Sequence, residues 1–278
     1  MSEKEELHIL SMGCGVQSTT LFLQDADGLS ETKFSAAIFA DVGDEPERIY
    51  AHLNWLKTVD NGAPLLIRKR GCLGDDLLNT DLERVSSIPA FTYNEAADRV
   101  GMIGRQCTSD YKINVVEKTI RQELLNLKPR QRVPKNVKVW QYVGFSLDEA
   151  GRAARARGRF NLRGWQDVKF PLIEDKMTRQ DCINYLEKRV PHHVPRSACV
   201  YCPYKSNREW LRLKNAGGTD WNRAVEIDKG LRTQGTPLQK RLNHPAYLHR
   251  SCKPLDECHF DEDQLSLFDL ECEGGCGL

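Results

Sequence analysis

The sequence predicts an α/β protein built on an open, mostly parallel twisted sheet with helices on both faces. Short apolar runs typical of strands alternate with longer segments whose apolar residues fall on one side of a helix. A glycine-rich turn joins the first of these runs to the first helix. The 278 residues, of which 40% are hydrophobic, suffice to bury a substantial core.

The alternation is clearest in the first half of the chain. The expected strands are residues 7–10, 34–41, 64–70 and 137–145, and the expected helices are residues 16–26 and 44–59. The second of these helices has Pro46 and acidic residues near its start, as helix N-termini favour. Strands that alternate with helices in this way pair in parallel within one sheet.

The remainder of the chain favours helices. Residues 177–189 are expected to form a helix that Thr178 caps, and two further helices are expected at 206–215 and 219–232. We therefore expect residues 1–205 to form the α/β domain. Residues 206–278 are expected to form a small helical extension with a cysteine-rich mobile tail.

The formal net charge is only +1, but the charges are unevenly distributed. Residues 99–163 contain fifteen Lys and Arg against five Asp and Glu, whereas residues 254–278 contain eight acidic residues and no basic one. A basic middle and an acidic tail favour an anionic substrate, with the tail lying against the basic surface. The alternative is two ordinary solvated faces.

Membrane insertion is not expected, because no run of about 18 apolar residues occurs. The N-terminus is polar and acidic, unlike a secretory signal, so we expect a cytoplasmic protein. The oligomeric state is not predicted.

The glycine turn, within the stretch SMGCGVQSTT, is a candidate anion site. Backbone N–H groups at a helix N-terminus point toward a bound anion, and the helix dipole favours negative charge there. Gly13 and Gly15 allow close approach of a ligand, and Ser18 and Thr19 add hydroxyl donors. The alternative is a strand–helix turn that binds nothing.

Ten cysteines are unusual for a cytosolic chain and favour metal binding or catalysis over disulfides. Cys199 and Cys202 form a C-x2-C pair, a spacing at which two thiolates can bind one metal ion or one cluster. By itself this pair is compatible with half a zinc site, a redox pair or part of an iron–sulfur site.

Four segments together resemble the PP-loop adenine-nucleotide hydrolase-like superfamily. The stretch SMGCGVQSTTL resembles the PP-loop, and its Gln17, in place of the more usual Asp, is similar to 3′-phosphoadenylyl-sulfate (PAPS) reductases. The stretches FADVGDEPERIY, RQCTSDYKINVV and GFSLDEAGR resemble further motifs of that family. The resemblance begins near residue 7, weakens beyond Arg208, and is nearest to the subgroup found in bacteriophages and mobile elements.

This resemblance implies an adenine nucleotide (PAPS, adenylyl sulfate or ATP) at the carboxyl edge of the sheet, as in other open α/β sheets. The residues expected to bind the nucleotide are Ser11, Gly13, Gly15, Val16, Gln17, Ser18, Thr19, Asp41 and Gly144. Asp41 would meet ribose, adenine or a metal ion; its alternative role, shared with Asp44, is helix capping.

The resemblance also implies a [4Fe–4S] cluster. Cys107, Cys199 and Cys202 match three of the four ligands, while Gln106 stands where the family's other cysteine would be. Cys272 or Cys276 would supply the fourth thiolate, unless the fourth iron is open. Zinc is the first alternative, and a metal-free redox pair is the second.

The final residues, LECEGGCGL, are similar to the C-terminus of sulfonucleotide reductases, whose cysteine attacks the sulfate sulfur. Cys276 is therefore the expected nucleophile, and thioredoxin or another thiol would release sulfite. Arg105 and Lys112, with Arg152 and Arg155, lie in segments that match the family's active-site loops and would bind phosphate or sulfate.

Three functions follow from these features. The first is a PAPS-reductase-like oxidoreductase. The second is an ATP-dependent enzyme that adenylates or thiolates a nucleic acid or nucleoside using a sulfur donor; the basic middle favours it, but Gln17 would hold Mg²⁺ poorly. The third is a non-catalytic nucleotide or iron–sulfur sensor.

Overall fold

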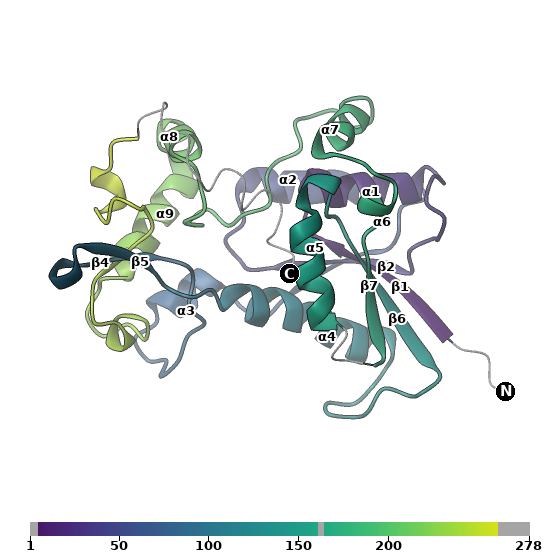
Figure 1. Cartoon of the computed structure of the whole chain (residues 1–278), viewed down its shortest axis with the longest axis horizontal. Helices are drawn as coiled ribbons and strands as arrows, with labels where there is room; N and C mark the ends of the chain where they lie inside the picture. The colour runs from purple at the N-terminus through teal and green to yellow at the C-terminus, as the bar shows by residue number, and fades with distance from the viewer. Residues whose placement is uncertain (1–4, 161–163, 261–278) are drawn as a thin grey trace.

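A five-stranded parallel sheet forms the first region of the molecule (Figure 1). The computed structural model describes residues 5–160 and 164–260. The strand order is β3-β2-β1-β6-β7, and each neighbouring pair is parallel. The strands are β1 (Glu5–Met12), β2 (Ala36–Asp41), β3 (Leu65–Lys69), β6 (Val137–Val143) and β7 (Gln166–Lys169). The predicted α/β class is confirmed, although β7 was not expected.

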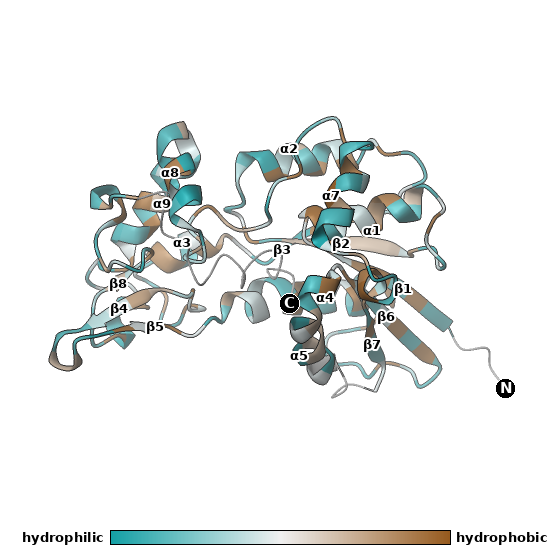
Figure 2. Ribbon diagram, turned by 45° about the horizontal axis from the view of Figure 1, so that its top comes forward, coloured by the Kyte–Doolittle hydropathy of each residue, from teal (hydrophilic) through white to brown (hydrophobic). Residues whose placement is uncertain are grey.

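Helices cover both faces of this sheet, because successive side chains of a strand point to opposite faces. Ile9 belongs to one apolar cluster and Leu10 to another. The cluster around Leu10 contains residues of three helices, α1 (Val16–Ala26), α2 (Glu47–Leu56) and α7 (Arg179–Glu187). The cluster around Ile9 contains residues of α4 (Asn114–Thr119), which π-helical turns precede and follow at η2 (Thr108–Ile113) and η3 (Ile120–Leu124). Figure 2 shows α1, α2 and α7 on one side of the sheet and α4 on the other.

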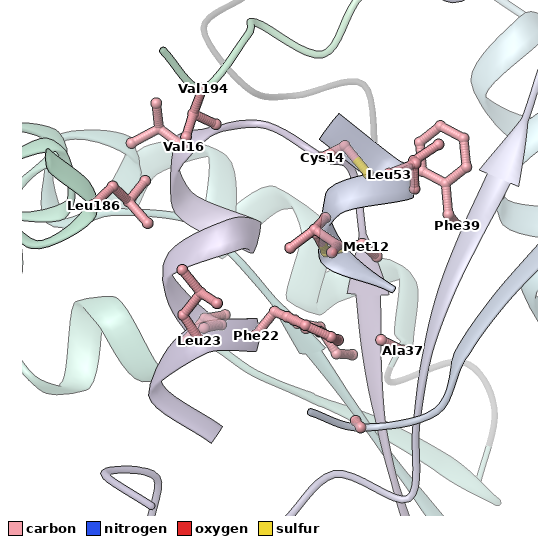
Figure 3. Packing of buried hydrophobic residues seen from close by; sticks show 14 of the residues in the cluster. Met12, Cys14, Val16, Phe22, Leu23, Ala37, Phe39, Leu53, Leu186 and Val194 are labelled. Atoms are coloured by element: carbon pink, nitrogen blue, oxygen red, sulfur yellow. The ribbon is translucent and has the colours of Figure 1, made fainter. Parts of the chain in front are cut away.

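The close packing of α1 on the sheet is visible in Figure 3. Phe22 of α1 lies near Ala37 of β2, and Leu53 of α2 lies near Phe39 of the same strand. All four residues are buried, each with at most 1% of its surface exposed. This packing places the start of α1 directly beyond the end of β1.

The segment after β6 is helical where a loop was expected from the resemblance. A short turn η4 (Leu147–Glu149) leads into α5 (Ala150–Phe160). Ala153 and Ala156 of α5 are buried in a cluster with Val143 and Val168. Their spacing of three residues puts both alanines on one face of α5. The short helix α6 (Pro171–Glu174) then follows β7.

A second region lies beside the sheet, at the left of Figure 1. It contains a three-stranded antiparallel sheet, in the order β5-β4-β8, that was not expected. Its strands are β4 (Phe91–Asn94), β5 (Arg99–Met102) and β8 (Ala246–Tyr247), and its helices are α3 (Leu73–Leu78), α8 (Asn207–Ala216) and α9 (Gly218–Gly230). Its single-turn helices are η1 (Glu95–Ala97), η5 (Gln239–Arg241) and η6 (Leu255–Glu257).

The helices expected in the later part of the chain are confirmed as α7, α8 and α9. Thr178 caps α7 as predicted, since its side chain accepts a hydrogen bond from the N–H of Asp181. The core of the second region combines early residues such as Val85 and Tyr111 with late residues such as Trp210. Within residues 5–160 and 164–260, no helix is long and apolar enough to cross a membrane.

Candidate functional site

The candidate site lies where the direction of strand order reverses. From β1 the chain proceeds outward through β2 to β3, whereas β6 lies on the other side of β1 and leads to β7. In open α/β sheets, ligands bind outside the carboxyl ends of the two strands at such a point. Here the glycine loop (residues 13–15) follows β1, and Gly144 follows β6.

The glycine loop leaves the N-terminus of α1 without a side-chain cap. Gly15 is the N-cap residue, and no side chain bonds to the first-turn amides from that position. The N–H of Gly13 donates to Ser18 Oγ over 3.2 Å, and Ser18 Oγ donates to the carbonyl of Gly15 over 3.3 Å. Uncapped first-turn N–H groups and the helix dipole make this position suitable for an anion.

Cys14 shapes this loop without taking part in the site. Its φ of 60° lies in the left-handed region, which lets the chain turn sharply between the two glycines. Its side chain is completely buried in the cluster that α1 forms with the sheet (Figure 3). Burial raises the pKa of the Cys14 thiol well above its ordinary value. Cys14 therefore fills a tight turn with a small buried side chain.

Gly144 brings the end of β6 into contact with the start of α1. A Cβ atom at position 144 would lie 2.8 Å from the backbone nitrogen of Ser18 and 2.9 Å from the carbonyl carbon of Gln17. Backbone atoms in a buried helix cannot move aside easily, so this position requires glycine. Gly144 thus packs closely against the first turn of α1, and its role in nucleotide binding stays a prediction.

Ser197 lies over the glycine loop from the opposite side. A Cβ atom at Gly13 would lie 3.7 Å from Ser197 Oγ, and one at Gly15 would lie 3.7 Å from the Ser197 nitrogen. Ser197 is 3% exposed, and its Oγ has no hydrogen-bond partner among the described residues. Sequence reasoning missed this residue, because a single serine in an irregular segment carries no signal.

Gln17 connects the start of α1 to the segment after β6. Its Nε2 donates to Glu149 Oε2 over 3.0 Å, and the other oxygen of Glu149 pairs with Arg152 at 2.5 Å. Gln17 is only 3% exposed. A carboxylate at position 17 would face the Glu149 carboxylate, so the amide suits this environment electrostatically.

Several predicted nucleotide-binding side chains are instead bonded within the protein. The Thr19 hydroxyl lies 2.9 Å from His52 Nε2 in the core, and Ser11 Oγ donates to Gln141 Oε1 over 3.3 Å. Asp41 accepts hydrogen bonds from the Gly43 N–H at 2.7 Å and from the Tyr50 hydroxyl at 3.0 Å. The side chain of Val16 packs in the core.

Neither of the two aspartates after β2 caps α2, but Asp44 accepts a hydrogen bond from the N–H of Gly74 in the first turn of α3. The N-cap position of α2 is Pro46, and no side chain caps that helix. Asp41 supports the turn after β2. The carboxylate of Asp44 is instead bonded to three other segments, around residues 72–74, 201 and 223.

The two thiols of the C-x2-C pair lie together. The N–H of Cys202 donates to the carbonyl of Cys199 over 3.0 Å, closing a tight turn. A hydrogen bond between the two thiols, together with burial, raises the pKa of Cys199 well above its ordinary value. Asp44 anchors the turn, since its carbonyl accepts from Val200 N–H at 2.9 Å and its carboxylate accepts from the Tyr201 hydroxyl at 3.0 Å.

Cys107 and Arg105 lie on the same side of the molecule as this pair. Cys107 and Cys199 both pack against the core of the second region. The N–H of Cys107 donates to the Ser87 carbonyl over 3.1 Å. The guanidinium of Arg105 lies over the ring of Tyr204, 6.0 Å from its centroid. Cys272 and Cys276 lie outside the described residues.

The thiol pair supplies a donor set that suits a soft metal ion or an iron–sulfur cluster. Within the described part of the chain, however, no three His, Cys, Asp or Glu side chains are grouped as metal ligands. The Cys199–Cys202 pair therefore provides two ligands, and any cluster or zinc ion there needs further thiols. Cys107, Cys272 and Cys276 remain the predicted sources.

Glu45, which follows β2, forms an ion pair with the half-buried Lys112. Lys112 Nζ lies 3.3 Å from Glu45 Oε1, and the Glu45 side chain is fully buried. The pKa of Cys14 is raised mainly by burial, and that of Cys199 mainly by the hydrogen bond with Cys202 and by burial; the negative charge of Glu45 contributes to both. Among the described residues, Glu45 Oε2 has no hydrogen-bond partner. Lys112 was predicted from the resemblance, whereas Glu45 was missed.

Comparison of the chain with protein-family models, with curated proteins and with solved structures gave no match.

Proposed function

We propose that the chain is a PP-loop enzyme, similar to PAPS reductases, that binds an adenine nucleotide at the glycine loop and transfers sulfur at cysteine thiols. One observation carries the nucleotide part of this proposal. The glycine loop leads into the uncapped start of α1, and beside it lies the buried hydroxyl of Ser197, which has no partner among the described residues. A buried hydroxyl without a partner is unfavourable, and a phosphate or sulfate oxygen would accept its hydrogen bond.

The sulfur chemistry proposed is reduction of the nucleotide's sulfate. The thiolate of Cys276 attacks the sulfur, the S–O bond to the 5′-phosphate breaks, and the nucleotide leaves with that electron pair. The Cys276 S-sulfonate then reacts with a dithiol donor of the thioredoxin type, which releases sulfite and is oxidised to a disulfide. The role of Cys276 rests on the resemblance alone.

Two half-buried cations support an anionic substrate. Lys112 pairs with Glu45, and Arg152 pairs with Glu149, which also accepts a hydrogen bond from Gln17 at the start of α1. Fixed positive charge in a site of low polarity stabilises bound phosphate and sulfate. Cys199 and Cys202, with Cys107 and a thiol of the C-terminal tail, are the proposed ligands of a [4Fe–4S] cluster or a zinc ion. When bound, such a group would hold these thiolates together and tune the electrostatics of the site.

A second candidate function, ATP-dependent modification of a nucleic acid, is favoured by α5. Ala153 and Ala156 face the protein, while Arg155 and Arg157 of the same helix are exposed. Exposed arginines along one helix suit a polyanion. This function requires ATP, Mg²⁺ and a sulfur donor.

One set of assays separates the two functions. Protein purified without oxygen is analysed for iron, sulfide and zinc, and titrated calorimetrically with PAPS, adenylyl sulfate and ATP. Sulfite release from PAPS or adenylyl sulfate supports the reductase, whereas pyrophosphate release from ATP in the presence of nucleic acid supports the modification enzyme. If no nucleotide binds, the proposed function is wrong.

The variant Ser197→Ala tests whether the buried Ser197 hydroxyl binds the nucleotide. We expect the variant to bind the preferred nucleotide about 10-fold more weakly, because one hydrogen bond to a charged group is lost. Folding stability should change little, since the hydroxyl has no partner within the protein. Ser30→Ala, in the turn between α1 and β2 at the opposite edge of the sheet, is the matched control. Equal affinity of Ser197→Ala and the wild type would remove Ser197 from the site.

A further inference from the structure

Glu45 has an oxygen that the fold leaves without a partner. Its side chain is completely buried, and Oε1 lies 3.3 Å from Lys112 Nζ. Oε2 accepts no hydrogen bond from any described residue. Leaving a buried carboxylate oxygen unpaired costs folding free energy, so the position is unfavourable in the protein without a ligand.

The location of Glu45 links it to the candidate site. Glu45 follows β2, which is the neighbour of β1 in the sheet, at the same edge as the glycine loop. The preceding residue, Asp44, bonds through its carbonyl to the N–H of Val200, within the C-x2-C turn. Glu45 is therefore at the same sheet edge as the glycine loop and directly follows the residue that is bonded to the C-x2-C turn.

The chemistry of Glu45 restricts what can pair with Oε2. An ionised carboxylate accepts hydrogen bonds and donates none. A phosphate or sulfate oxygen would be repelled by it, whereas a neutral hydroxyl or amino group would be attracted. A nucleotide contains both kinds of group, an anionic end and a nucleoside with hydroxyl and amino donors.

We propose that Glu45 Oε2 accepts a hydrogen bond from a neutral donor of the nucleoside, either a ribose hydroxyl or the adenine amino group. This inference rests on the proposed nucleotide binding and adds a residue that determines specificity. The anion binds at the glycine loop while Glu45 selects the nucleoside attached to it. Lys112 balances part of the charge of Glu45, which weakens the repulsion between the carboxylate and an anion at the loop.

Glu45→Gln tests this assignment, because the amide has nearly the same shape and presents an N–H₂ group where Oε2 was. Binding of adenosine 5′-monophosphate is measured calorimetrically in the presence of EDTA, so that no divalent cation contributes. We expect affinity to fall about 10- to 100-fold. Inorganic sulfate should bind as well as, or better than, it binds the wild type, because only repulsion is removed. Glu47→Gln, exposed in the first turn of α2, is the matched control.

Three analogues identify the donor: 2′-deoxy-, 3′-deoxy- and 6-deamino-adenosine 5′-monophosphate. For the analogue that lacks the relevant donor, wild type and Glu45→Gln should bind equally. Thermal unfolding without ligand shows whether the variant is folded. If it is not, Glu45→Asp, which retains an acceptor but shortens the reach by one methylene, should weaken the nucleotide and leave sulfate unchanged.

The outcomes separate this inference from the proposed function. A wild type that binds adenosine 5′-monophosphate, combined with a Glu45→Gln variant that binds it equally or more tightly, overturns the inference alone. A wild type that binds sulfate but no adenine nucleotide overturns the proposed function and the inference together.

Discussion

In the parallel sheet, adjacent residues of β1 alternate between two apolar clusters, whereas two buried carboxylates hold together the segments of the second region. Ile9 and Leu10 illustrate the first arrangement. In the second region, Asp228 accepts hydrogen bonds from the N–H of Leu248 at 2.8 Å and of Leu255 at 3.0 Å, and pairs with Arg232 at 2.7 Å. Asp44 similarly joins residues 72–74, 201 and 223.

This difference shows how two kinds of segment are stabilised. A strand between two layers of helices buries apolar side chains on both faces, so its stability comes from area removed from water. Irregular segments such as residues 242–260 leave backbone N–H groups that need acceptors inside the protein. A buried carboxylate satisfies several of them at once. The candidate site combines both kinds of stabilisation: apolar packing holds the start of α1 on the sheet, and the Asp44 carboxylate holds the C-x2-C turn.

The largest effect should come from removing a carboxylate that the second region depends on. In Asp228→Asn, one oxygen becomes an N–H₂ group that faces N–H donors, and the charge that pairs with Arg232 is lost. Because Asp228 is fully buried, we expect the free energy of unfolding to fall by about 3–5 kcal/mol. Urea unfolding measures this change.

Asp256→Asn is the control in the same region. Asp256 pairs with Lys229 at 2.8 Å, but both side chains are exposed, so the loss should stay below about 1 kcal/mol. Equal losses for the two variants would show that buried carboxylates do not hold this region.

A smaller effect is expected from Gly144→Ala, which acts on the packing between β6 and α1. The added methyl group would press on backbone atoms of Gln17 and Ser18 at 2.8–2.9 Å. We expect a loss of about 1–3 kcal/mol in unfolding free energy. The free energy of nucleotide binding should weaken by more than the free energy of unfolding, because the start of α1 is displaced.

Gly158→Ala in α5 is the matched control for that prediction, since a Cβ atom there meets nothing within 4 Å. Alanine favours helix over glycine, so this variant should be more stable by up to about 1 kcal/mol. Nucleotide binding to Gly144→Ala with wild-type affinity would contradict the close contact between β6 and the glycine loop.

The smallest effect is expected in the pH dependence of stability. It can be measured separately for the two regions, because each has one buried histidine, His52 and His249. Burial, reinforced by His192, lowers the pKa of His52 to about 4, and burial with Arg250 lowers that of His249 to about 4. Below pH 6.5 the unfolded chain binds protons that the folded protein does not. The stabilisation is therefore complete above pH 6.5 and is lost as the pH falls toward 4.

His52→Gln and His249→Gln should each reduce the slope of unfolding free energy against pH by up to about 1.4 kcal/mol per pH unit between pH 4 and 6.5. If the two regions unfold together, either variant changes the same single transition. Two transitions, each altered by one variant only, would show that the regions unfold separately. His193→Gln, on an exposed residue, should change neither.

Much of the parallel sheet was predictable because its determinants are local. The apolar runs, the cap at Thr178 and the glycine turn each depend on residues a few positions apart. The strand β7, with the sequence QDVK, was missed because its short edge-strand sequence is mostly polar. The helix α5 was missed because arginines and glycines obscured the two buried alanines that hold it.

The small antiparallel sheet was not predictable for a different reason. Phe91 of β4 pairs with Tyr247 of β8, more than 150 residues away. Such pairing depends on the tertiary structure that brings both segments together. The same holds for Tyr201 and Arg223, which bond to Asp44 from distant parts of the chain.

By itself, the sequence determined where most strands and helices of the first region lie along the chain, and the presence of a glycine loop at the start of α1, because periodic burial and helix termini depend on neighbouring residues. Only the tertiary structure decided what surrounds that loop. Gly144, Ser197 and Glu45 come from segments 30 to 180 residues away from it. The sheet's strand order and the Asp44 contacts bring them there, and neither is encoded in a local pattern.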